Sequence, residues 1–240
     1  MFETLRDELA QHPAPPAFFF RDDDADQDIA PLRRLLEIFG ERHAPLSLAV
    51  IPGTLTVDAA RLLRETAREP WLGLHQHGWR HVNHEPTGRK CEFGPSRPYA
   101  EQYADIARGQ ARLLEMLGPS SAPVFTPPWN RCTSDTCRAL TELGFAALSK
   151  DNSSRLGATP AEMSIAVDIF TWKSGPQLKT AAQIAGEIRR AASRPEPLGV
   201  LLHHKVMTGE AFALVAALLD HLRPAAPFLL LEESSCASRN

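Results

Sequence analysis

The sequence lacks the features that mark several common classes of protein. No apolar run approaches the roughly 20 residues that a membrane helix needs, and the acidic, amphipathic start MFETLRDELAQHP is not a secretory signal. Lys and Arg number 26 against 29 Asp and Glu, so there is no basic excess for a nucleic-acid surface or a polybasic membrane anchor. We therefore expect a cytoplasmic protein with no nucleic-acid partner and no membrane span.

Two further absences exclude common cofactor and redox sites. The four cysteines contain no C-x-x-C pair, so neither a zinc ribbon nor a thiol redox motif is predicted; they are Cys91, Cys132, Cys137 and Cys236. The first strand-to-helix turn also lacks the glycine-rich loop that would cradle a phosphate group. A dinucleotide-binding fold is therefore not indicated.

Short apolar runs alternate with helical stretches along the whole chain. Strands are expected at 17–20, 45–52, 71–76, 124–125, 145–148, 165–170, 199–202 and 227–231. Helices are expected at 31–42, 56–68, 99–117, 134–143, 180–192 and 210–222. This alternation predicts a parallel α/β protein, and with no linker or repeat we expect one domain over residues 1–240. A closed or nearly closed barrel fits the number of strands, with an open doubly wound sheet as the alternative.

Histidine is concentrated in one short segment. The chain has nine histidines, so a ten-residue window should hold about 0.4 of them, yet residues 75–84 hold four. These are His75, His77, His81 and His84, and a second pair, His203 and His204, lies near the end of the chain. Metal binding is the usual reason for such a cluster.

Each polar cluster of the sequence follows the end of an expected strand. The segments are Asp22–Asp24, His77 with His81, Pro127–Trp129 and His203 with His204. In parallel α/β folds the active site lies at the carboxyl edge of the sheet, so four distant segments are expected to meet at one mouth. Taken singly, each has a plain alternative: the aspartates would form a solvated acidic turn, and the histidines would lie in the core. Asp168 and Trp172 lie at the end of another expected strand, and there the alternative is a core tryptophan.

In this order, the segments resemble the five motifs of the polysaccharide deacetylase family, the carbohydrate esterases of the NodB-homology type, from about residue 17 to 231. The family motifs are a paired Asp, H-x-x-x-H, R-x-P-aromatic, an acid with a Trp, and L-x-H. The resemblance implies a distorted (β/α) barrel of about seven strands and a single deacetylase-like catalytic domain. It also places the chain in a divergent branch, because Thr126 stands where the family has Arg, and His204 replaces the Asp of the fifth motif.

The resemblance further implies a role for individual residues. Asp23 would be the catalytic base and His203 the general acid, while Asp24, His77 and His81 would bind one divalent metal ion. Zinc suits such a mixed nitrogen and oxygen donor set with an open position. The residues expected to bind substrate or to support the site are Trp129, Asp168, Trp172, His75, Trp79 and His204.

The family arginine orients the base, and Arg21 or Arg131 is expected to take its place.

The function implied is a metal-dependent hydrolase of carbon–nitrogen bonds other than peptide bonds, which removes an N-acetyl group from an amino sugar or glycan precursor. The alternatives are a metal-dependent amidohydrolase acting on a non-sugar amide, and a catalytically impaired homologue that binds carbohydrate. The expected partner is a small-molecule or glycan substrate, and the oligomeric state is left open.

Overall fold

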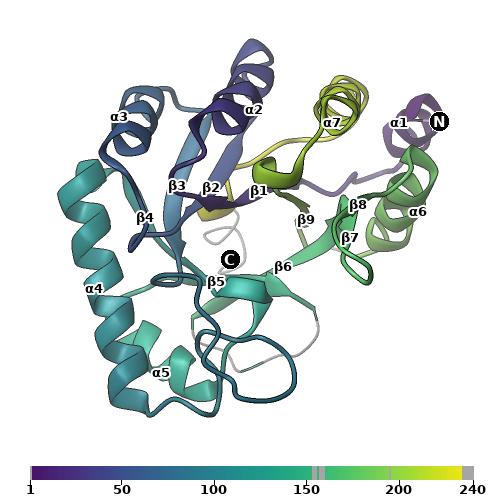
Figure 1. Ribbon diagram of the computed structural model, residues 1–240. Coiled ribbons are helices and arrows are strands. Elements are labelled where there is room, and N and C mark those ends of the chain that lie inside the picture. The colour runs from purple at the N-terminus through teal and green to yellow at the C-terminus, as the bar shows by residue number, and fades with distance from the viewer. Residues whose placement is uncertain (1, 153–155, 157–159, 195, 234–240) are drawn as a thin grey trace.

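The computed structural model describes residues 2–152, 156, 160–194 and 196–233. Helices surround a central barrel of strands (Figure 1). The helices are α1 (Phe2–Ala10), α2 (Ile29–Glu41), α3 (Val57–Thr66), α4 (Tyr99–Leu117), α5 (Ser134–Glu142), α6 (Ala181–Ala191) and α7 (Gly209–Leu222). Three short 3₁₀ turns are η1 (Gly118–Ser120), η2 (Pro128–Asn130) and η3 (His204–Val206).

Seven parallel strands close the barrel in the order β1-β2-β3-β4-β5-β6-β9, and β9 pairs with β1. They are β1 (Phe18–Ala25), β2 (Leu46–Val50), β3 (Leu72–His77), β4 (Ser121–Thr126), β5 (Ala147–Asp151), β6 (Ala161–Asp168) and β9 (Leu198–Leu202). A small antiparallel pair, β7 (Phe170–Thr171) and β8 (Gln177–Leu178), lies outside it. The predicted closed (β/α) barrel is confirmed, and the open sheet is excluded.

Side chains along each strand alternate between the barrel interior and the helical layer. In β1, Phe18 and Phe20 join the core under the helices, whereas Phe19 joins the interior cluster with Leu201. The same alternation sends Arg21 and Asp23 inward and Asp22 outward. The barrel therefore changes from apolar to polar toward the carboxyl ends of its strands.

One expected strand is absent. Residues 227–231 form only an isolated bridge, from Phe228 to Phe18, and a short helical turn begins at Leu231. The segment bonds to β1 through the Phe18 amide and carbonyl, and Leu231 enters the interior cluster. Its apolar residues thus close the end of the barrel opposite the polar one instead of adding a strand to the sheet. No helix among residues 2–233 that the structure describes is long and apolar enough to cross a membrane.

Candidate metal centre

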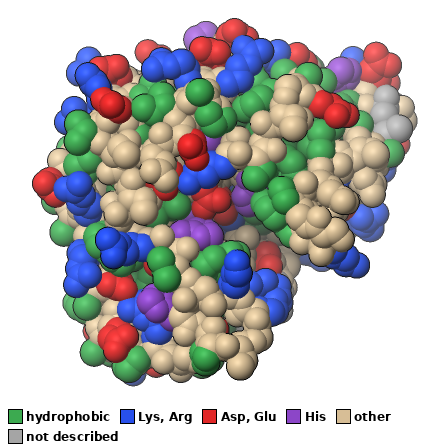
Figure 2. Space-filling view, in the orientation of Figure 1, with side chains coloured by type: hydrophobic (Ala, Val, Ile, Leu, Met, Phe, Trp, Pro, Cys, Tyr) green, Lys and Arg blue, Asp and Glu red, His purple; other side chains and the backbone are tan. Residues whose placement is uncertain are grey.

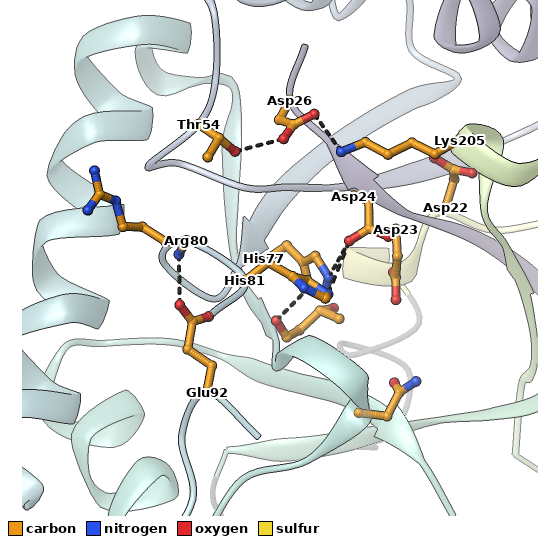
Figure 3. Close-up of polar contacts among 12 residues, drawn as sticks. Asp22, Asp23, Asp24, Asp26, Thr54, His77, Arg80, His81, Glu92 and Lys205 are labelled. Atoms are coloured by element: carbon orange, nitrogen blue, oxygen red, sulfur yellow. Dashed lines mark hydrogen bonds and ion pairs between the residues drawn. The ribbon is translucent and has the colours of Figure 1, made fainter. Parts of the chain in front are cut away.

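Asp24, His77 and His81 converge at the carboxyl end of the barrel (Figure 3). Asp24 Oδ1 lies 3.3 Å from Nε2 of both histidines, and one donor atom from each residue lies within 4.8 Å of the others. Asp24 Oδ1 is buried and has no hydrogen-bond partner in the described chain. A buried carboxylate oxygen facing two imidazole nitrogens fits a divalent cation, because the cation supplies the charge that the oxygen lacks.

The two histidines are delivered in different ways. His77 is the last residue of β3, and its Nδ1–H donates to the Thr126 carbonyl at 3.0 Å, which leaves Nε2 facing Asp24. His81 lies outside regular structure, in a loop that turns through Gly78 with a φ of 56°. Glycine is needed there, because a Cβ would lie 2.6 Å from Pro128 and 2.2 Å from a Glu92 oxygen.

The protonation states of the three donors suit cation binding. Burial opposes ionisation of Asp24, but the His77 ring, with Nε2 at 3.3 Å, and its charge outweigh it and hold the Asp24 pKa well below its usual range. Burial and the neighbouring His77 lower the pKa of His81 to about 4, so its ring is neutral at pH 7. Burial disfavours charge on His77, yet the carboxylates of Asp23 and Asp24 raise its pKa.

Asp23 is held by an arginine from its own strand. Arg21 Nε and Nη2 donate to the two Asp23 oxygens at 2.8 and 2.9 Å, and Arg21 is completely buried. The same guanidinium donates to Ser149 Oγ at 2.8 Å and to Asn130 Oδ1 at 2.7 Å. Burial works against the Asp23 charge, but the charges of Arg21, His77 and His203 together outweigh it, so the Asp23 pKa is lowered. Of the two arginines expected near the base, it is therefore Arg21 that contacts it.

Arg131 is directed elsewhere, and Thr126 has a different partner. Arg131 Nη1 donates to the Lys90 carbonyl at 2.8 Å. Thr126 Oγ1 hydrogen-bonds His75 Nε2 at 2.9 Å inside the barrel. Burial, followed by the charge of Arg21, lowers the His75 pKa to about 3. His75 is thus a neutral imidazole below the donor cluster and does not belong to it.

The two adjacent histidines after β9 occupy different environments. His203 Nε2 lies 3.4 Å from Asp168 Oδ2, which also accepts the Trp172 indole N–H at 2.8 Å. Burial opposes a charge on His203, but the bond and charge of Asp168, together with the charges of Asp23 and Asp22, outweigh it and raise the His203 pKa. Its Nδ1 is buried without a partner in the described chain. Asp168 thus favours the protonated form of His203 and leaves its Nδ1 available to donate.

His204 faces away from the mouth. Its ring Nδ1 lies 2.5 Å from Asp22 Oδ2, its backbone N–H donates to Asp22 Oδ1 at 2.8 Å, and both side chains are fully buried. This pair ties the turn after β9 to β1. A second tie lies above it, where Lys205 contacts Asp26 at 2.7 Å and Thr54 donates to the same carboxyl group (Figure 3). Both ties fix the segment that carries Asp23 and Asp24.

The three candidate tryptophans are placed differently. The Trp129 ring lies 4.3 Å from the His81 ring, and the Trp172 ring lies 4.7 Å from His203. Trp79 does not join them: it packs against the cluster under α4 and α5, with the Arg108 guanidinium 5.4 Å from its ring. The face in Figure 2 shows histidine and acidic side chains gathered around a hollow near its centre.

Backbone strain is concentrated at this mouth. Of the five non-glycine residues with positive φ in the described chain, four surround the site: Asp24, His81, Trp129 and Asn130. Such conformations cost of order 1–3 kcal/mol each and persist where surrounding contacts enforce them. The site is thus a feature that the rest of the fold holds in place.

The structure adds residues that the sequence did not single out. Ser149 and Asn130 complete the bonding of Arg21, and Glu92 contacts the loop between the two histidines. Their partners are distant in sequence, and no periodicity or spacing identifies them. Only the R-D-D-D run indicated the contact between Arg21 and Asp23 in the sequence, because residues 21 and 23 of a strand lie on the same face.

The comparisons with known proteins identify a family by sequence and a shared fold by structure. The sequence pattern of the family described as Polysaccharide deacetylase matches residues 10–148. A search of curated proteins found no match. Three solved structures illustrate the shared fold. A protein from Mycobacterium smegmatis assigned to the polysaccharide deacetylases has a TM-score of 0.68 and 18% identity, covering 95% of this chain and 93% of that one.

A Streptococcus mutans CE4 esterase has a TM-score of 0.65 and 16% identity, over 95% of this chain and 90% of its own. A CE4 family pseudoenzyme from Bacillus anthracis has a TM-score of 0.63 and 12% identity, over 93% of this chain and 66% of its own. At these identities the likeness establishes the fold alone.

Proposed function

This chain belongs to the polysaccharide deacetylase family, and we propose that it is a metal-dependent hydrolase that removes the N-acetyl group from an amino sugar or glycan precursor. The observation that supports it best is the buried, unpartnered Asp24 oxygen facing two imidazole nitrogens. The arginine-bound Asp23 and His203, whose pKa is raised, lie in the same mouth. A divalent cation, a base and an acid are the three components that metal-dependent amide hydrolysis uses.

Asp24, His77 and His81 would hold the cation, and zinc suits this donor set with an open position. When bound, the ion lowers the pKa of a water molecule and polarises a carbonyl group. Asp23 accepts the proton of the attacking water. Arg21 keeps Asp23 ionised and fixes the plane of its carboxylate, so that one orientation is maintained throughout.

His203 supplies the proton that the leaving amine requires. Asp168 holds the ring through Nε2 and favours its charged form, which leaves the Nδ1 proton for the substrate nitrogen. By its resemblance to the family, the backbone N–H of Trp129 would bind the developing oxyanion. The left-handed φ of 56° at Trp129 sets the direction of this amide. The products are acetate and a free amino sugar.

Metal analysis combined with an acetate-release assay tests this function. Purified wild-type protein should bind one divalent ion per chain and release acetate from at least one member of a panel of N-acetyl sugars. His77→Ala should lose the metal, whereas Asp23→Asn should keep it and lose turnover by about 100- to 10,000-fold, the usual contribution of a general base.

The other outcomes separate the alternatives. Hydrolysis of simple amides in preference to N-acetyl sugars would identify a non-sugar amidohydrolase. Metal binding with no turnover on either class would identify a carbohydrate-binding homologue that has lost catalysis. Full metal occupancy in His77→Ala would show that the ligands are wrongly assigned.

A further inference from the structure

Glu92 is a buried carboxylate that the mechanism does not use. It lies in the connection between β3 and α4 and is completely shielded from solvent. No cationic side chain in the described chain forms an ion pair with it, and burial raises its pKa. A buried acid without a counter-charge is costly, so its retention needs a specific reason.

The partners of this carboxylate are backbone amides of a single loop. Glu92 Oε2 accepts the Trp79 N–H at 3.1 Å, and Oε1 accepts the Arg80 N–H at 2.8 Å and, more weakly, the Val82 N–H at 3.5 Å. Figure 3 shows Glu92 directly beneath Arg80, with His77 and His81 beside it. These amides belong to the loop 78–82, which contains the candidate ligand His81 and directly follows the other, His77.

The other bonds of the loop hold its first two residues: the Gly78 N–H donates to the Thr126 carbonyl, and the Gly78 and Trp79 carbonyls accept bonds from Gln76 and Gly53. His77 is fixed by β3 and Thr126, but His81 has a φ of 58° and follows a glycine turn with no strand or helix to hold it. A positive φ at a non-glycine residue is unfavourable, so the loop would relax unless its amides were bonded elsewhere. Two carboxylate oxygens facing consecutive N–H groups form the anion-in-nest arrangement that enforces such a turn.

Glu92 is itself anchored on the outer helices. Its carbonyl accepts an Arg97 N–H at 3.3 Å, and Arg97 in turn pairs with Asp105 of α4 at 2.7 Å. The next residue, Phe93, is buried and accepts a bond from Thr136 of α5 through its carbonyl. Rigid elements outside the barrel are thus connected through Glu92 to the loop that presents His81.

We infer that Glu92 is a positioning residue for the metal centre, which holds the 78–82 loop so that His81 lies at ligand distance from Asp24 and His77. This inference rests on the proposed function, because it assumes that the three residues bind a cation. Outer partners of ligands of this kind typically contribute 10- to 100-fold to metal affinity. Such partners usually bond the side chain of the ligand, whereas Glu92 bonds the backbone of the loop that carries the ligand.

The test compares metal affinity with the stability of the metal-free protein. Glu92→Ala and Glu92→Gln are prepared without metal, and zinc affinity is measured by competition with a chromophoric chelator. The matched control is Glu85→Ala, because Glu85 lies in the same connection but its carboxylate bonds Ser96, at 3.1 Å through the N–H and 2.7 Å through the hydroxyl. Cobalt(II) absorption in the visible range reports the coordination geometry, and thermal unfolding reports stability.

We expect Glu92→Ala to bind zinc about 10- to 100-fold more weakly and to show an altered cobalt spectrum. Glu92→Gln keeps one acceptor oxygen and should fall between Glu92→Ala and the wild type, and Glu85→Ala should match the wild type. Wild-type affinity in a folded Glu92→Ala would overturn the inference alone. Unfolding of both Glu92 variants would overturn it too, since the carboxylate would then support the whole domain. Absence of zinc binding by the wild type would overturn the proposed function as well.

Discussion

Arg21 is a charged side chain in a part of the barrel where apolar side chains are the rule. Along β1 it is the inward-facing residue between Phe19, which packs in the interior cluster, and Asp23. Its cost of burial is offset by four hydrogen bonds, of which two form a fork on the Asp23 carboxylate. A guanidinium can make these contacts together because its donors lie in one plane.

Replacing Arg21 by Lys should therefore show how much catalysis depends on the forked geometry of the guanidinium and how much on its positive charge. Arg21→Lys keeps the positive charge but loses the fork, so Asp23 gains rotational freedom. We expect kcat to fall by about 10- to 100-fold, part of what a general base supplies, with metal content unchanged. Steady-state kinetics and metal analysis measure both quantities. Arg131→Lys is the control and should remain near wild type, because the Arg131 side chain bonds the Lys90 carbonyl away from the base. The reverse result would assign the orienting role to Arg131.

Substitutions of the two adjacent histidines should distinguish an effect on catalysis from an effect on stability. His203→Ala should retain the metal and lose about 100- to 10,000-fold in turnover, because it removes the proton donor. His204→Ala should keep much of its turnover at low temperature but lose stability, by about 3–5 kcal/mol where a buried partner is left unpaired, here Asp22. Acetate release and urea unfolding of both variants check this. If His204→Ala is inactive and His203→Ala is normal, the roles of the two residues are exchanged.

Much of this arrangement could be predicted from period-two alternation. Alternation along a strand puts Asp22 and Asp23 on opposite faces, and likewise His203 and His204. It cannot say which partner each residue meets: Arg21 reaches Ser149, a contact set by barrel closure and not by local sequence. The left-handed backbone at Asp24 is equally invisible in the sequence, because tertiary contacts impose it.

At the scale of elements, the six expected helices were placed to within one or two residues, because amphipathic spacing and caps act locally, whereas α1 was not expected. The helix expected at 99–117 is α4, with the same bounds. Strands were less well placed: the run at 145–148 became β5 at Ala147–Asp151, two to three residues later. Strand ends depend on pairing with neighbours, which short apolar runs do not encode. For the same reason residues 227–231, apolar enough for a strand, instead close the barrel end.

One element of the barrel depends on a glycine for close packing. Gly199 of β9 lies opposite Phe19 of β1, and a Cβ there would lie 2.4 Å from the Phe19 ring and 2.8 Å from the Ser164 carbonyl. The carbonyl belongs to the backbone of β6 and cannot move aside. Gly199→Ala should therefore destabilise the protein by about 1–3 kcal/mol, as overpacking of a core does.

Urea unfolding measures the change, and Gly209 supplies the control. Gly209 begins α7, no atom lies within 4 Å of the position that a Cβ would occupy, and alanine fits its helical backbone. Gly209→Ala should be neutral or stabilising by up to about 1 kcal/mol, through the entropy of the unfolded chain. Equal effects at the two positions would show that β9 can move away from Phe19.

The whole molecule is a barrel with two unlike ends. The carboxyl end is polar, strained and carries the candidate metal centre, whereas the opposite end is closed by the segment after α7 through Leu231. The closing segment nonetheless brings in a carboxyl group, Glu232, beside Ser47 of β2 and against Gly73 of β3. Buried ionisable groups thus lie at both ends of the barrel.

Glu232 should make the stability of the fold depend on pH. Burial raises its pKa above the ordinary value of 4.5, and the bond donated by Ser47 offsets this only in part. The folded state therefore binds this proton more tightly than the unfolded state. The contribution of Glu232 is favourable below pH 4.5 and is lost as the pH rises from there through the raised folded-state pKa.

Glu232→Gln replaces the carboxyl group with a neutral one of the same shape, so it removes this dependence. We expect the variant and the wild type to have similar free energies of unfolding near pH 4, and the variant to be more stable at about pH 7–8. Urea unfolding at several pH values measures the difference. The control is Glu233→Gln, because Glu233 is the exposed neighbour and its carboxylate bonds the Leu230 N–H. A stability difference for Glu232→Gln that is constant from about pH 4 to pH 8 would contradict the prediction, because a neutral substitution then changes packing and not the titration of a buried acid.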